Sequence, residues 1–172
     1  MTRCRGAWFF TMAGLLALSS AARAQAPNGP CKPVFDVMLK EAATPHHAVT
    51  IRNGGAPVEA ISTADANYVM SRGQWRRSPI TPKDQLAQQQ ENIRTVTKQS
   101  CTALPDEVID GKPTSVYHAN YEQKDLGASD AKIWIAKATG LPLRTDVTLQ
   151  ADEKTNVSTR FDYDHITAPA VK

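Results

Sequence analysis

Histidines are the first candidates for chemistry in this sequence, because imidazole can ligate metals and can act as an acid or base near neutral pH. The chain contains His46, His47, His118 and His165. Successive residues of a strand point to opposite faces, so His46 and His47 cannot share a metal ion there. No spacing among the four matches a common metal-ligand set. We therefore expect no metal site, and a hydrolase that uses His118 and His165 is only a third hypothesis.

Other catalytic signatures are absent from the sequence. It contains no G-x-S-x-G segment and no cysteine beside an obvious base. Asp162 and Asp164 could serve as acid and base, but on a strand they share the face opposite Phe161 and Tyr163, which favours a solvated position. No glycine-rich phosphate loop is present. We predict a protein that is not an enzyme and needs no cofactor.

The N-terminus has the pattern of a secretory signal peptide. Arg3 and Arg5 precede an apolar run over residues 7–17, and small residues suit cleavage after Ala24 or after Ala26. The run is short for a membrane span, so a retained anchor is the weaker interpretation. We predict that residues 1–24 are removed, that residues 25–172 form one domain without a transmembrane segment, and that the domain resides in the periplasm.

Removal of this leader changes the charge and the cysteine count. Three of the 20 basic residues lie in the leader, so the remaining chain carries 17 basic and 17 acidic residues. This balance argues against a nucleic-acid partner. Cys31 and Cys101 remain, and in an oxidising compartment they most simply form one disulfide that ties the N-terminal segment to the end of the central helix. A catalytic thiol is the weaker interpretation, because neither cysteine has a basic neighbourhood.

The first half of the domain combines helices with short strands. Residues 32–43 form a helix candidate with Pro33 in its first turn. Strands are predicted over residues 47–52, 58–63, 68–71 and 74–77, with a hairpin turn at residues 53–55. Residues 81–100 form the long helix, which Thr81 can cap. Its apolar residues are sparse, so we expect it to lie against an open sheet and not in a core.

The second half reads as consecutive antiparallel strands, over residues 103–109, 114–123, 132–137, 141–149 and 157–166. The hairpin of residues 132–149 is the clearest signal: Ile133 and Ile135 alternate with Trp134, and Gly140 supplies the turn. The connections are too short for parallel crossovers. We predict a mainly β, α+β fold: an open antiparallel half-barrel whose concave face is covered by a short N-terminal helix and a longer central helix.

Three C-terminal segments resemble the LolA-like superfamily of periplasmic proteins, which includes lipoprotein carriers, the receptor LolB and RseB-type stress sensors. The segments are VYHANYEQKD, KIWIAKATGLPLRTDVTL and VSTRFDYDHI. They contain the strand with Trp134, the Gly140–Leu141–Pro142 turn and the aromatic strand that ends at Tyr163 and Ile166. The resemblance implies a half-barrel with helices in its concave opening, where carriers of the family hold acyl chains.

The leading hypothesis is a periplasmic binding protein for a lipid, acyl chain or other apolar ligand on the concave face, with a role in envelope lipid or lipoprotein trafficking. An uncovered concave face is a typical ligand site. The candidate lining residues come from both faces of the predicted strands: Trp75, Leu86, Ile93, Trp134, Ile135 and Phe161. The alternative is an envelope sensor or interaction protein whose sheet is filled by its own side chains. An envelope hydrolase is the third possibility.

Overall fold

The computed structural model describes residues 29–124, 127–150 and 154–171, which form two helices and nine strands in the predicted order. The helices are α1 (Lys32–Ala42) and α2 (Pro82–Arg94). The strands before α2 are β1 (His46–Arg52), β2 (Val58–Ser62), β3 (Asn67–Ser71) and β4 (Gln74–Arg77). The strands after it are β5 (Val96–Ile109), β6 (Lys112–Gln123), β7 (Gly127–Ala136), β8 (Pro142–Gln150) and β9 (Lys154–Asp162). The predicted leader, residues 1–24, lies outside the described residues.

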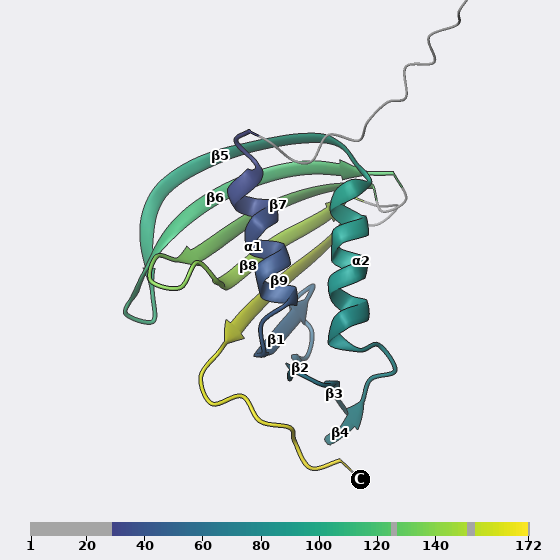
Figure 1. Ribbon diagram of the computed structural model, residues 1–172. Helices are drawn as coiled ribbons and strands as arrows, with labels where there is room; N and C mark the ends of the chain where they lie inside the picture. The colour runs from purple at the N-terminus through teal and green to yellow at the C-terminus, as the bar shows by residue number, and fades with distance from the viewer. Residues whose placement is uncertain (1–28, 125–126, 151–153, 172) are drawn as a thin grey trace, which may run out of the picture.

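All of these strands belong to one open antiparallel sheet, in the order β4-β3-β2-β1-β9-β8-β7-β6-β5. Each strand pairs with its sequence neighbour, except where β1 pairs with β9 and joins the two halves. β4 and β5 are the two edges of this sheet. The sheet curves around the two helices (Figure 1). The prediction of an open half-barrel with two helices on its concave face is confirmed.

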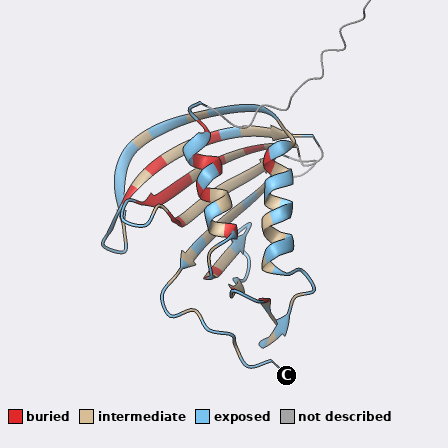
Figure 2. Cartoon of the chain, in the orientation of Figure 1, coloured by how far each residue is buried: buried red, intermediate tan, exposed pale blue. Residues whose placement is uncertain are grey.

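The connectivity of the sheet explains the position of α2. The chain leaves the sheet at one edge strand, β4, and re-enters it at the other, β5. The connection must therefore cross the opening of the half-barrel, and a helix of 13 residues spans about 20 Å of that path. α2 lies over the concave side although only Ile93 is buried in it (Figure 2).

The main core lies between α1 and the concave face of β6 and β7. Val34 and Val37 of α1 pack with Ala119, Ala131 and Ile133 in one buried cluster, to which Ile135 also belongs. Ala119 and Ala131 have no exposed surface. Such short side chains let the helix approach the strands closely, and the larger aliphatic side chains fill the remaining space. This contact fixes which face of the sheet is concave and covered.

The central helix is shorter than predicted. Thr81 caps it as expected: its hydroxyl accepts a hydrogen bond from the Asp84 N–H, and the Asp84 carboxylate accepts one from the Thr81 N–H. However, α2 ends at Arg94 instead of residue 100, and Val96 begins β5. The cause is the run of β-branched residues from Thr95 to Thr97, which favours a strand. This strand pairs with the end of β6.

The predicted disulfide between Cys31 and Cys101 is confirmed, but its position in the fold differs. Because α2 ends early, Cys101 lies inside β5 and not at the end of the helix. Cys31 is the N-cap residue of α1. The bridge therefore joins the start of α1 to an edge strand of the sheet. Phe35 and Ile93 pack beside it in a second buried cluster, which links both helices to the disulfide.

The hairpin of β7 and β8 has the predicted alternation. Ile133 and Ile135 face α1, so Trp134 points to the opposite face of the sheet. Gly140 has a φ of 64°, a left-handed conformation that glycine adopts without steric cost. Its N–H donates to the carbonyl of Ala136 at 2.7 Å and closes the turn.

The last strand ends earlier than predicted, at Asp162 instead of residue 166. The Asp164 N–H donates to the Asp162 carboxylate at 3.0 Å, and His165 has a φ of 53°. An aspartate that accepts a hydrogen bond from the second residue after it turns the chain and competes with strand pairing. Tyr163 consequently leaves the strand and lies against His46 of β1.

We predict that the Cys31–Cys101 bridge is a major source of stability. The two cysteines are 70 residues apart, and a crosslink over such a loop stabilises a fold by on the order of 4 kcal/mol in the chain-entropy model. Urea unfolding of the oxidised protein should show a lower midpoint after reduction. The double variant Cys31→Ala/Cys101→Ala should have the same midpoint as the reduced protein, and added reductant should not change that midpoint. Equal midpoints for the oxidised, reduced and double-variant proteins would contradict this role.

Candidate functional site

A cavity of about 140 Å³ lies between the two helices and the concave face of the sheet. α1 and α2 contribute residues to one side of the cavity, and β7, β8 and the end of β9 contribute those of the other. Figure 1 shows the two helices over these strands. Most of its lining is apolar, and the full set is Val37, Met38, Glu41, Gln89, Ala131, Ile133, Pro142, Thr145, Val147 and Phe161. A hollow of about 150 Å³ accepts benzene, so this cavity has room for roughly half a dozen heavy atoms.

One ionisable group lines the cavity, the carboxyl group of Glu41. Its Oε1 lies 3.0 Å from Nε2 of His46, and the Glu41 and His46 side chains are only 18% and 6% exposed. Burial raises the pKa of Glu41 to about 7. Burial also lowers the pKa of His46. Both changes favour the uncharged forms, as expected where water is largely excluded.

The hydrogen bonds of His46 indicate how many protons the pair holds. Nδ1 lies 2.8 Å from the carbonyl oxygen of Thr44, which can only accept, so Nδ1 carries a hydrogen. Nε2 of the neutral ring is then an acceptor. Its contact with Glu41 requires one proton between the two groups, and burial favours the carboxylic acid donating to neutral imidazole. Below about pH 7, the Glu41–His46 pair therefore holds this proton as a hydrogen-bonded unit.

Tyr163 and Phe161 enclose this pair. The ring centroids of Phe161 and Tyr163 lie 5.8 Å and 6.1 Å from that of His46. The Tyr163 hydroxyl donates to the carbonyl of Pro142 at 2.9 Å. Burial, with a further contribution from the charge of Glu41, raises the pKa of Tyr163. The phenol thus stays protonated, and the aromatic rings screen one side of the Glu41–His46 pair from water.

The structure brings four of the six predicted lining residues to the concave side. Phe161 lines the cavity itself. Ile135 faces a groove of about 340 Å³ on the other flank of α1, and Val37 borders both hollows. Ile93 is buried against Phe35 and the disulfide. Leu86 lies half-buried on α2.

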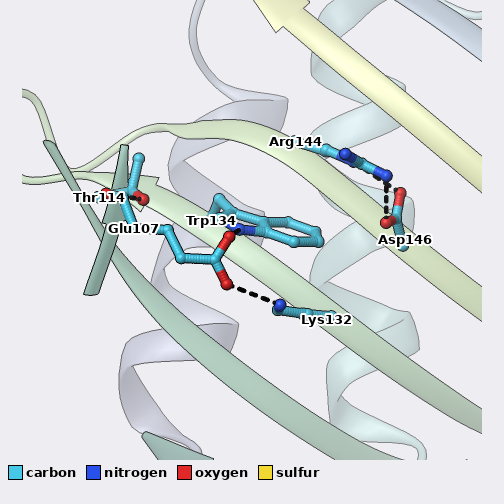
Figure 3. Close-up of polar contacts among 6 residues, drawn as sticks. All are labelled: Glu107, Thr114, Lys132, Trp134, Arg144 and Asp146. Carbon is cyan, nitrogen blue, oxygen red and sulfur yellow. Dashed lines mark hydrogen bonds and ion pairs between the residues drawn. The ribbon is translucent and has the colours of Figure 1, made fainter. Parts of the chain in front are cut away.

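Trp75 and Trp134 lie on the opposite face. The ring of Trp75 packs against His47 at 6.4 Å, on the side of β1 away from His46. Trp134 is 4% exposed although no helix covers it. Figure 3 shows its ring among the side chains of Lys132, Arg144 and Glu107, on the face turned away from the helices.

Charged side chains bury Trp134 on this outer face. Its indole N–H donates to Glu107 Oε2 at 2.8 Å, and Lys132 Nζ lies 2.8 Å from Glu107 Oε1. These hydrogen bonds lower the pKa of the Glu107 carboxyl, and the one from Lys132 has the largest effect. The Lys132 ammonium and the Arg144 guanidinium lie 4.6 Å and 4.8 Å from the ring centroid, distances that permit cation–π attraction. Trp134 is thus held by its own neighbours and does not face the cavity.

A larger hollow of about 490 Å³ lies beside this cluster, with Asp130, Lys132, Arg144 and Asp146 in its lining. These charges already have partners. Arg144 donates to both carboxylate oxygens of Asp146, at 3.0 Å and 2.6 Å, and Asp130 lies 3.0 Å from His118. A ligand would have to displace paired groups there. The smaller cavity, with apolar walls and one ionisable group, is the better candidate site.

The histidines do not assemble into a catalytic or metal site within the described part of the chain. His118 contacts Asp130, whereas His165 lies beyond the last strand. No group of three or more potential metal ligands occurs among the described residues. Over the same residues, neither α1 nor α2 is long and apolar enough to cross a membrane.

Glu41 was not predicted for this site from the sequence, and His46 was not singled out for it. One signal for Glu41 is present in the sequence: it follows Val34, Val37 and Met38 by seven, four and three residues, so it lies on the apolar face of the helix. A carboxyl group at such a position is unusual and marks a candidate functional residue. Its pairing with His46 depends on the turn at Thr44–Pro45, which the spacing alone does not reveal.

No family model matches the chain, and no curated protein sequence matches it. Among solved structures it is similar to lipoprotein LppX of Mycobacterium tuberculosis, at 12% identity and a TM-score of 0.46, over 79% of this chain and 98% of LppX. It is also similar to Pseudomonas aeruginosa MucB in its complex with MucA, at 13% identity and a TM-score of 0.45, over 79% of this chain and 58% of the other. It therefore spans less than two thirds of MucB.

A third similar structure is the LolA superfamily protein NE2245 from Nitrosomonas europaea, at 10% identity and a TM-score of 0.25, over 74% of this chain and 91% of NE2245. At such low identities these similarities concern only the arrangement of helices and strands.

We predict that Glu41 makes stability depend on pH. Its pKa is about 7 in the fold against 4.5 as its ordinary value, so its contribution is complete below pH 4.5 and is lost as the pH rises through 7. Glu41→Gln keeps an N–H donor for His46 Nε2 and carries no charge. Urea unfolding should show equal stabilities for wild type and Glu41→Gln at pH 4.5. At pH 8 the variant should be more stable by roughly 2 to 3 kcal/mol, since a tenfold change in proton affinity is worth about 1.4 kcal/mol.

The comparison has a matched control in Glu59, whose Oε2 lies 3.0 Å from His47 Nε2 and whose side chain is 40% exposed. Glu59→Gln should retain the pH dependence of the wild type. The lowered pKa of His46 has the opposite effect on the free energy of unfolding. Neutral His46 stabilises the fold above pH 6.5, its ordinary pKa, and this stabilisation is lost as the pH falls. His46 is present in all three proteins, so it largely cancels from the comparison. Parallel curves for wild type and Glu41→Gln would contradict the assignment to Glu41.

Proposed function

We propose that the chain is a non-enzymatic binding protein that holds the apolar part of an amphipathic molecule, such as a lipid, between α1, α2 and the concave sheet. The observation that carries the proposal is the cavity of about 140 Å³, whose lining is apolar except at Glu41, Gln89 and Thr145. Apolar surface removed from water is worth about 25 cal/mol per Å². A small hollow of this kind can therefore hold an alkyl group without any covalent chemistry.

The proposed site differs from the sequence-based set in its aromatic members. Phe161, Ile133 and Val147 provide the apolar floor, and Met38 provides part of the cover. The proposed site leaves out Trp75 and Trp134, because both face away from the helices. Ligands larger than the cavity would extend toward the groove lined by Ile135, past Val37, which borders both hollows.

The proposed location is the periplasm, with residues 1–24 as a cleaved leader. The Cys31–Cys101 bridge supports this location, because disulfides persist in oxidising compartments. We further propose a role in envelope lipid or lipoprotein trafficking, which rests on the apolar cavity and on the sequence resemblance to the LolA-like superfamily.

A second function, that of an envelope sensor or interaction protein, is favoured by how much of the concave face is already filled. Val34 and Val37 cover the β6–β7 floor, and Phe35 packs with Ile93 beside the disulfide. A protein of this kind would bind another envelope protein on its outer surface and would take up no apolar ligand.

A cavity-filling variant distinguishes the two functions. Val147→Phe adds a ring inside the cavity, whereas Thr148→Phe adds the same ring at the next position of β8, on the opposite face. We expect 1-hexanol to shift the methyl NMR signals of Val37 and Ile133 in the wild type. Thr148→Phe should retain this response, and Val147→Phe should weaken it about tenfold or more.

Both variants must first show wild-type-like unfolding midpoints, so that lost binding does not reflect lost folding. If Val147→Phe unfolds, the smaller Val147→Leu replaces it. Saturable shifts in the cavity methyl groups, abolished only by the cavity variant, support the binding function. Shifts that are absent or the same in all the proteins overturn it and favour the interaction protein.

A further inference from the structure

Glu41, Gln89 and Thr145 are the three polar residues of the cavity lining, and none of them carries a positive charge. They come from α1, α2 and β8, and the other lining residues are apolar. The lysine next to Glu41, Lys40, points elsewhere and donates to the carbonyl of Thr139. A ligand that places an anionic group among these residues would meet the Glu41 carboxyl with no cation in the lining to compensate.

Glu41 also retains unused acceptor capacity. Its Oε1 faces His46, whereas Oε2 has no hydrogen-bond partner among the described residues. The side chain of Gln89 likewise makes no hydrogen bond to a described residue, so its amide oxygen is a second acceptor. Thr145 adds a hydroxyl group. Groups of this kind suit a head group with several N–H donors, because an ammonium has three donors and no acceptor.

We propose that Glu41 and Gln89 select alkylammonium amphipaths, molecules with a protonated primary amine on an apolar chain, and reject those with a carboxylate head. The inference rests on the proposed binding function. The alkyl chain would lie against Ile133, Val147 and Phe161, and the ammonium would donate to Oε2 of Glu41 and to Gln89. A charge-assisted hydrogen bond in a site with little water is stronger than one in solution.

Binding of the ammonium is coupled to release of a proton. The free pair holds one proton between Glu41 and His46. When the ammonium binds, Glu41 becomes a carboxylate, the O–H bond breaks and the proton leaves for the solvent, so the cation replaces it in the site. The groups that face Glu41 are His46 from β1 and Tyr163 after β9, whereas α2, β7 and β8 present no ionisable group in the cavity. Between pH 6 and 8, affinity for the ammonium should therefore rise with pH.

The test uses three probes of equal chain length: hexylammonium, 1-hexanol and hexanoate. The proteins are wild type, Glu41→Gln and the control Glu59→Gln, which removes a carboxyl group from a histidine-paired glutamate on the other face. Calorimetric titration at pH 6.0, below the pKa of Glu41 in the fold, in two buffers of different ionisation enthalpy counts the protons released. We expect hexylammonium to bind about tenfold or more tightly than hexanoate in wild type and Glu59→Gln, with proton release. Glu41→Gln should lose this preference and the proton release while it retains 1-hexanol binding.

Each other outcome is decisive. Hexanoate binding as tightly as hexylammonium, or an order of affinities that Glu41→Gln leaves unchanged, overturns the selection by Glu41. In both cases 1-hexanol binding would still support the cavity as an apolar site. Failure of all three probes to bind the wild type overturns the proposed binding function, and the inference with it.

Discussion

The contact between α1 and the β6–β7 floor is the interaction on which the rest of the structure depends. Val34 and Val37 reach the sheet because Ala119 and Ala131 leave room for the helix. This contact decides which face of the sheet is concave, and it places Glu41, further along α1, above β8. The disulfide at Cys31 holds the start of the same helix to β5. α2 contributes less buried surface and completes the cover mainly because the chain must pass from β4 to β5.

The buried Glu41–His46 pair gives this architecture a chemical character that an apolar core would lack. Two polar groups with little access to water are retained next to a hollow, although an apolar pair would avoid the cost of desolvation. The cost is limited while the pair shares one proton, and it increases when that proton is lost. In the proposed function, stability and ligand choice are therefore linked through the same carboxyl group, which is why a single neutral substitution at Glu41 should affect both.

Much of the fold could be predicted from sequence, because its elements depend on local patterns. The alternation around Trp134 correctly separated Ile133 and Ile135 from the tryptophan, and Thr81 capped α2 as expected. The predicted end of α2 was wrong, because residues 96–100 pair with β6 as a strand and do not continue the helix. The site was harder to predict. Alternation shows that two faces differ but not which one a distant helix covers, so Trp134 was placed among the lining residues although charged neighbours enclose it outside.

The central claim is that the concave cavity holds an amphipathic molecule in the cell. Native mass spectrometry of the protein released gently from its own envelope tests this claim most directly. The predicted result is a population with an added mass that dissociates on mild activation and is lost from Val147→Phe but not from Thr148→Phe. A single ligand-free mass, unchanged after incubation with envelope lipid extract, would contradict the claim.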